Sequence, residues 1–445
     1  MRSLADDLRA RTDQQLAALV LARPDLLHPM PVDLTTLAQR AGSPASVAAA
    51  LRGYDQRTLH VILGAALTGD PVRPGALAAL LRPHLSELEA RAHARAAIAT
   101  LRAEALLWGT DRTLHLVGAA RDLMVPPDRG PRVAALDPVV AGFATEPGSL
   151  RVLIRGAPPG VPGVLDRLLA GPVIGTVADA RRVPDAARSP IDWLLAEHVL
   201  VPVGPDRVAL PAEVTAILRG AGPGDPALVV IDLATPAPAG PPRDPDRVDP
   251  GSVGAILDVL HRTGELGRLW AVSPPSRLRA GGIPARDLTR TARALSASEP
   301  ATALVIEVAA AAGLVATEGH DPAAVLPTTA FDGWLAGPPA HAHARLLAAW
   351  LAMPRAVAVA GQRPLAPDQV APTLPALRRG VLDALCSAAG DWTDAEVVAA
   401  VDWWAPRRHD ATRADRVRTI LAEARELGLV VGGTVTGAGR ALAGL

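Results

Sequence analysis

The sequence predicts a mainly helical protein of tandem winged-helix modules, each a helix-turn-helix followed by a β-hairpin, behind a helical N-terminal cap. The clearest indication is the stretch 419–442, TILAEARELGLVVGGTVTGAGRAL. Apolar residues recur there at helical spacing until Gly428, a residue suited to a left-handed helix end. Two short β-branched runs separated by a Gly-Gly turn follow, and this order is typical of a hairpin.

The same order of parts occurs four times along the chain. In each copy an apolar helix leads to a strand, a polar turn, a second strand and a short helix. The first strands are expected to begin near Leu107, Leu200, Leu314 and Leu429. Because this spacing is long and uneven, it favours a string of small domains with insertions over a solenoid of identical repeats.

The length of 445 residues exceeds what one hydrophobic core supports and indicates three or four domains. The predicted divisions are a helical cap at 1–55, module one at 56–125, module two at 149–220, a Pro-rich linker at 221–250, module three with an extra helix at 251–353, a second Pro-rich linker at 354–375, and module four at 376–445. Within the cap, helices are expected to begin at Thr12 or Asp13, at Asp33 and at Ser43. Module two is expected to contain a helix at 174–181.

Composition excludes several classes of protein. The single cysteine, Cys386, excludes an internal disulfide and a cysteine-based zinc site. No apolar run approaches the length of a membrane span and the start has no signal-peptide core, so a cytoplasmic protein without membrane contact is expected. All 45 basic residues are arginine. The absence of lysine excludes a Walker A loop and Schiff-base chemistry.

The 45 basic and 45 acidic residues balance, so the chain as a whole is not a basic nucleic-acid binder. Two local clusters nevertheless rank as candidate nucleic-acid contacts. The first has three arginines on one face of a predicted helix and two just upstream: Arg277, Arg279, Arg286, Arg290 and Arg293. The second precedes and enters the last long helix: Arg407, Arg408, Arg413, Arg416 and Arg418. Such faces suit phosphate contacts, and the alternative is an ordinary solvated surface.

The position of each helix in its module refines this choice. In a helix-turn-helix the second helix of the pair enters the major groove. In module three that helix, 299–313, is apolar nearly all round and carries Glu307, and in module two it carries Asp192 and Glu197. An arginine-rich helix in this position is expected in module four alone, at about 411–427. Module four and the Arg286 face are therefore the predicted nucleic-acid contacts, with Arg413 nearest the buried edge.

Several phrases resemble a known family, the actinobacterial helicase-associated proteins. They are LADDLRARTDQQLAALVLARPDLL, DLTTLAQRAGSPASVAAAL, SPIDWLLAEHVLVPVGPDRVALP, RLRAGGIPARDLTRTARAL, VIEVAAAAGLVA and LLAAWLAMPR. The resemblance covers nearly the whole chain. It lies in the general character and the order of these phrases and includes no catalytic motif. The family's far C-terminal part is similar to the C-terminal domain of XPB-type helicases and is expected to follow where Leu445 falls. The resemblance therefore implies a DNA-associated function without unwinding activity.

Together these patterns predict a non-catalytic DNA-associated or helicase-associated protein. The expected partners are DNA and a helicase-like or other protein, and no cofactor or metal is expected. The predicted absence of catalysis rests on the lack of a nucleophile–base or paired-carboxylate arrangement. The alternative, from another class, is a protein–protein interaction scaffold built from degenerate winged-helix modules.

Overall fold

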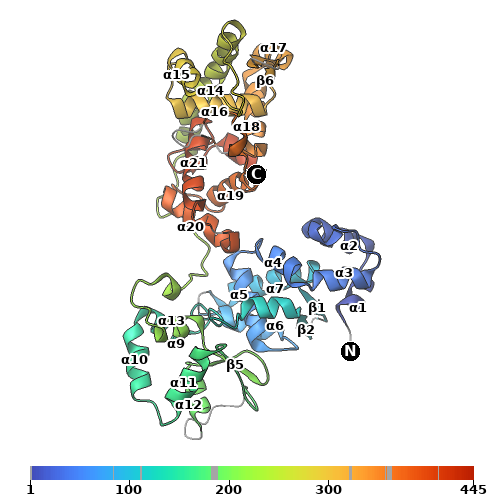
Figure 1. The fold of residues 1–445 in the computed structure, drawn as a ribbon, viewed down its shortest axis with the longest axis vertical. Coiled ribbons are helices and arrows are strands. Elements are labelled where there is room, and N and C mark those ends of the chain that lie inside the picture. Colours follow the sequence, from blue (N-terminus) through green and yellow to red (C-terminus); the bar gives the residue numbers. More distant parts are fainter. Residues whose placement is uncertain are drawn as a thin grey trace. The chain divides into compact units, whose positions relative to one another are not determined.

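The computed structural model describes residues 3–83, 85–110, 113–181, 189–319, 323–355, 357, 363–408 and 410–444. The structure is mainly helical, with 59 % helix, so the predicted fold class is confirmed at that level. The chain divides into two compact units (Figure 1). The first comprises Met1–Ala234 with Ala405–Arg408, and the second comprises Thr235–Trp404 with His409–Leu445. The division after Ala234 falls inside the predicted linker at 221–250.

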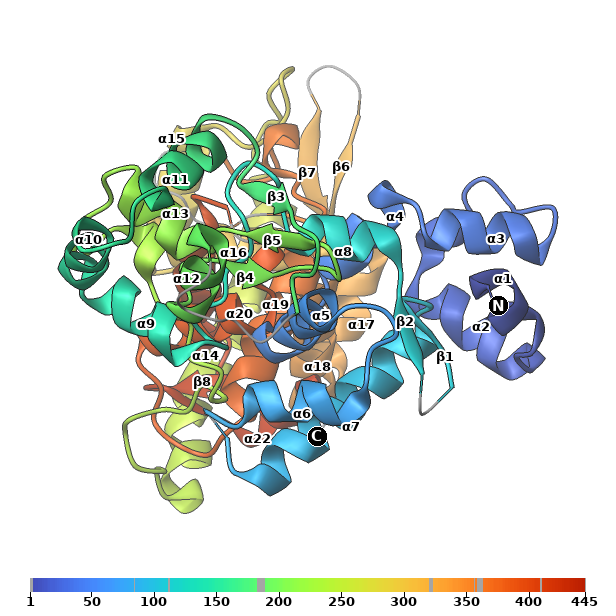
Figure 2. The same ribbon diagram turned by 90° about the horizontal axis from the view of Figure 1, so that it is seen from below.

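The N-terminal cap consists of short helices whose starts follow the predicted capping residues. Thr12, Asp33 and Ser43 each accept the backbone N–H three residues on, at 3.3, 2.7 and 3.4 Å. The elements are α1 Leu4–Arg9, α2 Asp13–Ala22, η1 Pro24–Leu27, α3 Leu34–Ala41 and α4 Pro44–Leu51. Helices α1, α2 and α3 lie side by side (Figures 1 and 2), and they share a small apolar core that also includes Ala105.

Module one follows the predicted order and contains α5 Gln56–Thr68, α6 Pro74–Leu81, α7 Glu87–Ala103, β1 Leu107–Gly109, β2 Leu114–Leu116 and α8 Gly118–Met124. Strands β1 and β2 are antiparallel with Leu107 opposite Leu116, which confirms the predicted hairpin. Val72, between α5 and α6, adds a bridge to Leu114 on β2.

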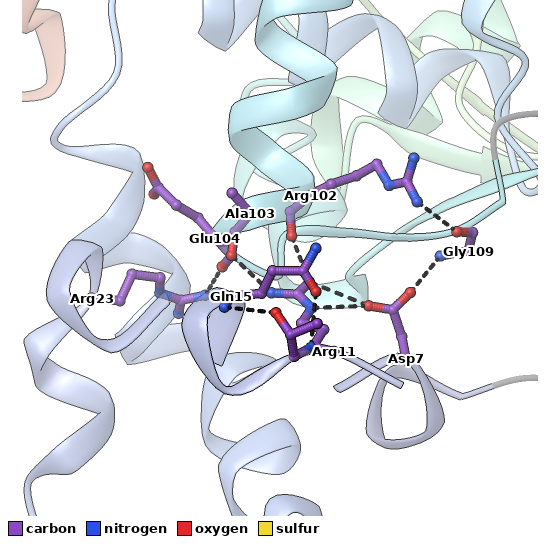
Figure 3. A network of polar contacts seen from close by, with 9 residues as sticks. Asp7, Arg11, Gln15, Arg23, Arg102, Ala103, Glu104 and Gly109 are labelled. Atoms are coloured by element: carbon purple, nitrogen blue, oxygen red, sulfur yellow. Dashed lines mark hydrogen bonds and ion pairs between the residues drawn. The ribbon is translucent and has the colours of Figure 1, made fainter. Parts of the chain in front are cut away.

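Arginine side chains fix the cap to the C-terminal end of α7 (Figure 3). The last carbonyls of a helix lack partners within the helix. Arg11 donates to the carbonyls of Arg102 and Ala103 at 2.5 and 2.8 Å, and Arg23 donates to that of Glu104 at 2.9 Å. Each guanidinium therefore joins the cap to module one through carbonyl groups at the end of α7.

Module two differs from its prediction in two places. It contains α9 Pro138–Thr145, α10 Pro147–Arg155, α11 Val161–Ala170, β3 Ile174–Thr176, α12 Pro190–Ala196, β4 Val201–Pro202, β5 Arg207–Ala209, α13 Ala212–Leu218 and η2 Pro226–Leu228. The helix expected at 174–181 is wrong, because its β-branched start forms β3, which pairs with β5 in the sheet order β3-β5-β4. The module also extends back before residue 149, because α9 packs on α10 and α13.

The second unit begins inside the predicted linker, because α14 starts at Pro245. Its first part contains α14 Pro245–Val272, α15 Ala285–Ala294, α16 Glu299–Ala311, β6 Val315–Glu318, β7 Ala324–Pro327, α17 Thr329–Ala336 and α18 Pro339–Ala352. Strands β6 and β7 form an antiparallel hairpin with Val315 opposite Pro327 (Figure 2). Among the described residues no single helix is long and apolar enough to cross a membrane. The bent pair α15–α16 reaches that length and apolar composition only when its two helices are taken together.

The second part of this unit contains η3 Pro367–Gln369, α19 Leu374–Cys386, α20 Asp394–Trp404, α21 Arg413–Glu426, β8 Val430–Val431, β9 Thr434–Val435 and α22 Gly437–Ala443. The β8–β9 pair confirms the fourth predicted hairpin. The segment predicted as a linker at 354–375 is instead packed into the unit where it is described. Val357 is buried, and the N–H of Ile283 donates to the Pro364 carbonyl at 2.8 Å.

A short extended segment precedes the last helices of every module and meets the hairpin that follows. Val72 pairs with β2, β3 pairs with β5, and Ser276 pairs with Ala324 on β7. In module four the N–H of Trp392 donates to the Gly433 carbonyl at 3.1 Å. The four modules therefore share one order of elements beyond the helix and hairpin that the sequence indicates.

A buried network of charges joins modules three and four. Arg378 on α19 is fully buried, and its Nε lies 3.2 Å from a carboxylate oxygen of Glu423 on α21. The same oxygen accepts the indole N–H of Trp350 on α18 at 2.6 Å. Arg355 pairs with the buried Glu307 on α16 at 2.8 Å. Burial raises the pKa of both glutamates, and the neighbouring arginines oppose that shift.

We predict that Arg378→Met lowers the stability of the second unit by about 3–5 kcal/mol, because it leaves the Glu423 carboxylate buried without its cation. Protection of α19 and α21 against hydrogen exchange in the full chain measures this loss. Arg379→Met is the matched control, because Arg379 is the next residue on α19 and is exposed. Its effect is expected to stay below about 0.5 kcal/mol. Equal effects of the two substitutions would contradict the role given to the buried pair.

We also predict that Arg23→Met loosens the cap without disturbing α9–α13. Arg23 is buried and also donates to the carbonyl of Ala41 and the hydroxyl of Ser46, at 3.0 and 2.6 Å. Hydrogen bonds of a charged donor contribute about 1.5–3 kcal/mol each, so hydrogen exchange in α1–α3 is expected to accelerate strongly. Arg9→Met removes only exposed contacts, with Asp6 and with the Thr35 hydroxyl, and is expected to change exchange little. Unchanged exchange in the Arg23 variant would show that the apolar core alone holds the cap.

Candidate nucleic-acid interface

Helix α15 presents the first predicted arginine cluster. Its inner face buries Asp287, Leu288, Thr291 and Ala292, and the Trp270 indole N–H of α14 donates to the Thr291 hydroxyl at 3.3 Å. The outer face carries three exposed arginines: Arg286, Arg290 and Arg293. The inner face packs against α16 and contacts α14 through Trp270, and α15 lies beside both helices in Figure 1.

The three arginines of α15 differ in their partners. Arg290 lies 3.3 Å from Asp287, whose side chain is 8 % exposed against 51 % for the arginine. Arg286 and Arg293 make no hydrogen bond or ion pair through their side chains with any described residue. An acidic group lies close by, because Glu299 at the start of α16 accepts the Thr289 hydroxyl at 2.6 Å. The face nevertheless keeps two unneutralised guanidinium groups.

The segment before α15 adds the other two arginines of this cluster. Arg277 and Arg279 are both exposed, and the backbone N–H of Arg277 donates to the carbonyl of Ala323 at 2.7 Å. The chain then turns at Gly281 and Gly282, whose φ angles of +84° and +80° suit glycine. All five predicted arginines of the cluster are thus exposed on α15 and the segment that leads into it.

The second predicted cluster is divided between the two units, and Arg416 and Arg418 are paired with acidic residues. Arg407 and Arg408 lie in η4 Pro406–Arg408, which belongs to the first unit. On α21, Arg416 lies 3.4 Å from Asp410, and Arg418 lies 2.8 Å from Asp415. The open side of α21 therefore offers less net positive charge than the sequence suggests.

Arg413 corrects the predicted set of nucleic-acid contacts. Its side chain is buried, its Nη2 donates to the Val401 carbonyl at 2.8 Å, and its Nε lies 3.1 Å from Asp402. Both partners belong to α20, so Arg413 joins α20 to α21. A side chain held in this way does not reach a phosphate outside the protein.

Sequence analysis overlooked one basic helix face in module one. Helix α7 occupies the same place in its module as α21, and Arg91 and Arg95 are exposed beside the face that buries Ala90 and Ala94. Arg91 pairs with Glu87 at 2.5 Å, and Arg95 has no partner among the described residues. The i, i+4 spacing of these arginines was the signal available in the sequence. The expectation that module four alone has arginines in this position is therefore wrong.

Comparison with family models, curated proteins and solved structures finds no significant match for this chain. The resemblance to helicase-associated proteins stays a prediction.

We predict that Arg413→Ala and Arg418→Ala separate a structural arginine from a surface one. Loss of Arg413 removes a buried charged hydrogen bond to the Val401 carbonyl and the ion pair with Asp402, so a destabilisation of about 1.5–3 kcal/mol is expected. Loss of the exposed Arg418 is expected to change stability by less than about 1 kcal/mol. Denaturant unfolding followed by hydrogen exchange at α21 measures both, and an Arg413 variant as stable as the Arg418 variant would contradict its structural role.

Proposed function

We propose that this chain is a non-catalytic DNA-associated protein built from four winged-helix modules. The observation that carries the proposal is the arginine face of α15, defined as Arg277, Arg279, Arg286, Arg290 and Arg293. In a chain of zero net charge, this face gathers exposed cations, and Arg286 and Arg293 have no carboxylate partner in the part of the chain that the structure describes.

The repeated order of elements supports the winged-helix assignment. Each module has a helix, a short extended segment, one or two further helices and an antiparallel hairpin. In module two the early strand pairs with the second hairpin strand, in the order β3-β5-β4. A helix-turn-helix followed by such a hairpin is a winged helix, which is the module that the sequence predicts.

The chemistry of the face supports a phosphate ligand. Guanidinium groups donate two parallel hydrogen bonds to a phosphate and keep their charge at every physiological pH. A row of guanidinium groups along one helix suits a ligand with several negative charges, such as a polyanion, better than it suits a single acidic side chain. DNA is the proposed polyanion, and a helicase-like protein is a proposed partner through the family resemblance.

A protein–protein scaffold is the second candidate, and exposed apolar residues on the cap favour it. Leu21, Met30 and Val32 are 82, 72 and 90 % exposed, and large apolar side chains at such exposure are typical of docking surfaces when they cluster. The two functions predict different behaviour. Salt-sensitive binding to DNA supports the first, and complete absence of binding at low salt leaves the second.

We predict that Arg286→Ala with Arg293→Ala weakens DNA binding at low salt and flattens its salt dependence. Each lost phosphate contact lowers the slope of log K against log salt by about 0.9, so two contacts lower it by about two units. Thermal stability is expected to change by less than about 0.5 kcal/mol, because both side chains are exposed and unpaired. Fluorescence anisotropy with a labelled duplex at several salt concentrations measures the slope.

The matched control is Arg247→Ala with Arg379→Ala, which removes the same charge from exposed positions on α14 and α19. Little change in the slope is expected for this pair. Arg416→Ala with Arg418→Ala is expected to fall between the two, because Asp410 and Asp415 already neutralise those arginines. An equal loss in all three pairs would show that total charge, rather than the α15 face, governs binding.

A further inference from the structure

The structure points to a ligand class for the α15 face, and we infer that it binds the phosphate backbone of DNA without reading sequence. This inference rests on the proposed function and goes beyond it. The reason is the burial of α16, the helix that follows α15 in module three.

Helix α16 is the second helix of its pair and therefore occupies the place from which a helix-turn-helix reads base edges. Here nine consecutive residues, from Ala301 to Ala309, are buried. The two polar side chains in that run are Thr302 and Glu307. Glu307 pairs with Arg355 and accepts the N–H of Leu365 at 2.6 Å, so its carboxylate is committed to the interior.

The exposed start of α16 does not provide base-reading groups either. The N-terminal residues of a recognition helix make the base contacts, and here they are Glu299 and Pro300. A carboxylate repels the DNA backbone, and its contact to the Thr289 hydroxyl holds it beside α15. The chain contains no asparagine or lysine, and neither α15 nor α16 carries a glutamine. The usual partners of adenine are therefore missing from this pair of helices.

The arginines that remain lie on the first helix of the pair. In a helix-turn-helix the first helix crosses the backbone instead of entering the groove. The four residues of β6 include no basic side chain, and the exposed ones are Ala316, Thr317 and Glu318. Trp270, Phe331 and Trp334 are all buried, so these aromatic rings offer no surface on which an unpaired base could stack. Phosphate is the part of DNA that this face contacts.

The test measures the affinity of the full chain for short duplexes of equal length and unrelated sequence, including pure A·T and pure G·C. Dissociation constants within about threefold of one another are expected, since sequence-specific proteins differ by at least about a thousandfold. Inorganic polyphosphate is expected to displace every duplex. The Arg286→Ala, Arg293→Ala variant is expected to weaken all duplexes by the same factor, whereas the Arg247→Ala, Arg379→Ala control leaves all of them unchanged.

Strong preference for one duplex would overturn the inference while leaving DNA binding intact, as would a loss in the α15 variant confined to some sequences. Absence of binding to every duplex would overturn the proposed function and the inference with it. Equal binding that the α15 variant does not weaken would place the contact on another face and also overturn the inference.

Discussion

Carbonyl groups at helix ends need hydrogen-bond donors from outside the helix, and arginine side chains supply these donors at several places in this structure. Arg11 and Arg23 close the end of α7, Arg345 donates through two nitrogens to the Ala312 carbonyl after α16, and Arg378 donates to carbonyls after α18. A guanidinium carries five donors in a rigid fork, so one side chain can satisfy acceptors from two segments at once. Each of these contacts fixes one element to the end of another.

This use of arginine commits several of the chain's basic residues to contacts within the protein. Arg413 ties α21 to α20, and Arg425 pairs with Asp394 while donating to the Gly432 carbonyl. The arginines of α15 stand apart, because the inner face of that helix is fixed by Leu288 and Thr291 instead. Positive charge counted along the sequence therefore overstates what a ligand meets, and the count on exposed faces is the relevant one.

The sequence predicted those features that depend on residues close together in the chain. The helix starts at Thr12, Asp33 and Ser43 and the pairing of Leu107 with Leu116 follow from capping residues and apolar alternation within a few residues. Burial of Arg413 was not predictable in the same way, because it depends on how α20 packs against α21. The exposed row on α15 was visible as i, i+4, i+7 spacing, but the absence of an ion pair at Arg286 and Arg293 among the described residues depends on how α15 packs. The packed segment at 354–375 was misjudged as a linker because its prolines hide contacts made far away in sequence.

The buried charges that join α16, α18, α19 and α21 also bear on how this chain can change over evolution. Glu307 and Glu423 belong to different modules, yet the arginines that neutralise them lie next to each other in space, because Arg378 donates to the backbone carbonyl of Arg355 at 2.9 Å. A fragment ending in the 354–375 segment would keep Glu307 and lose Arg378, and one beginning there would separate the network at another point. A recombination or deletion between Arg355 and Arg378 keeps both ion pairs but removes the Trp350 indole from Glu423 and the Arg355 carbonyl from Arg378. We therefore expect modules three and four to be exchanged as one block. A break between Ala234 and Pro245 leaves this network whole.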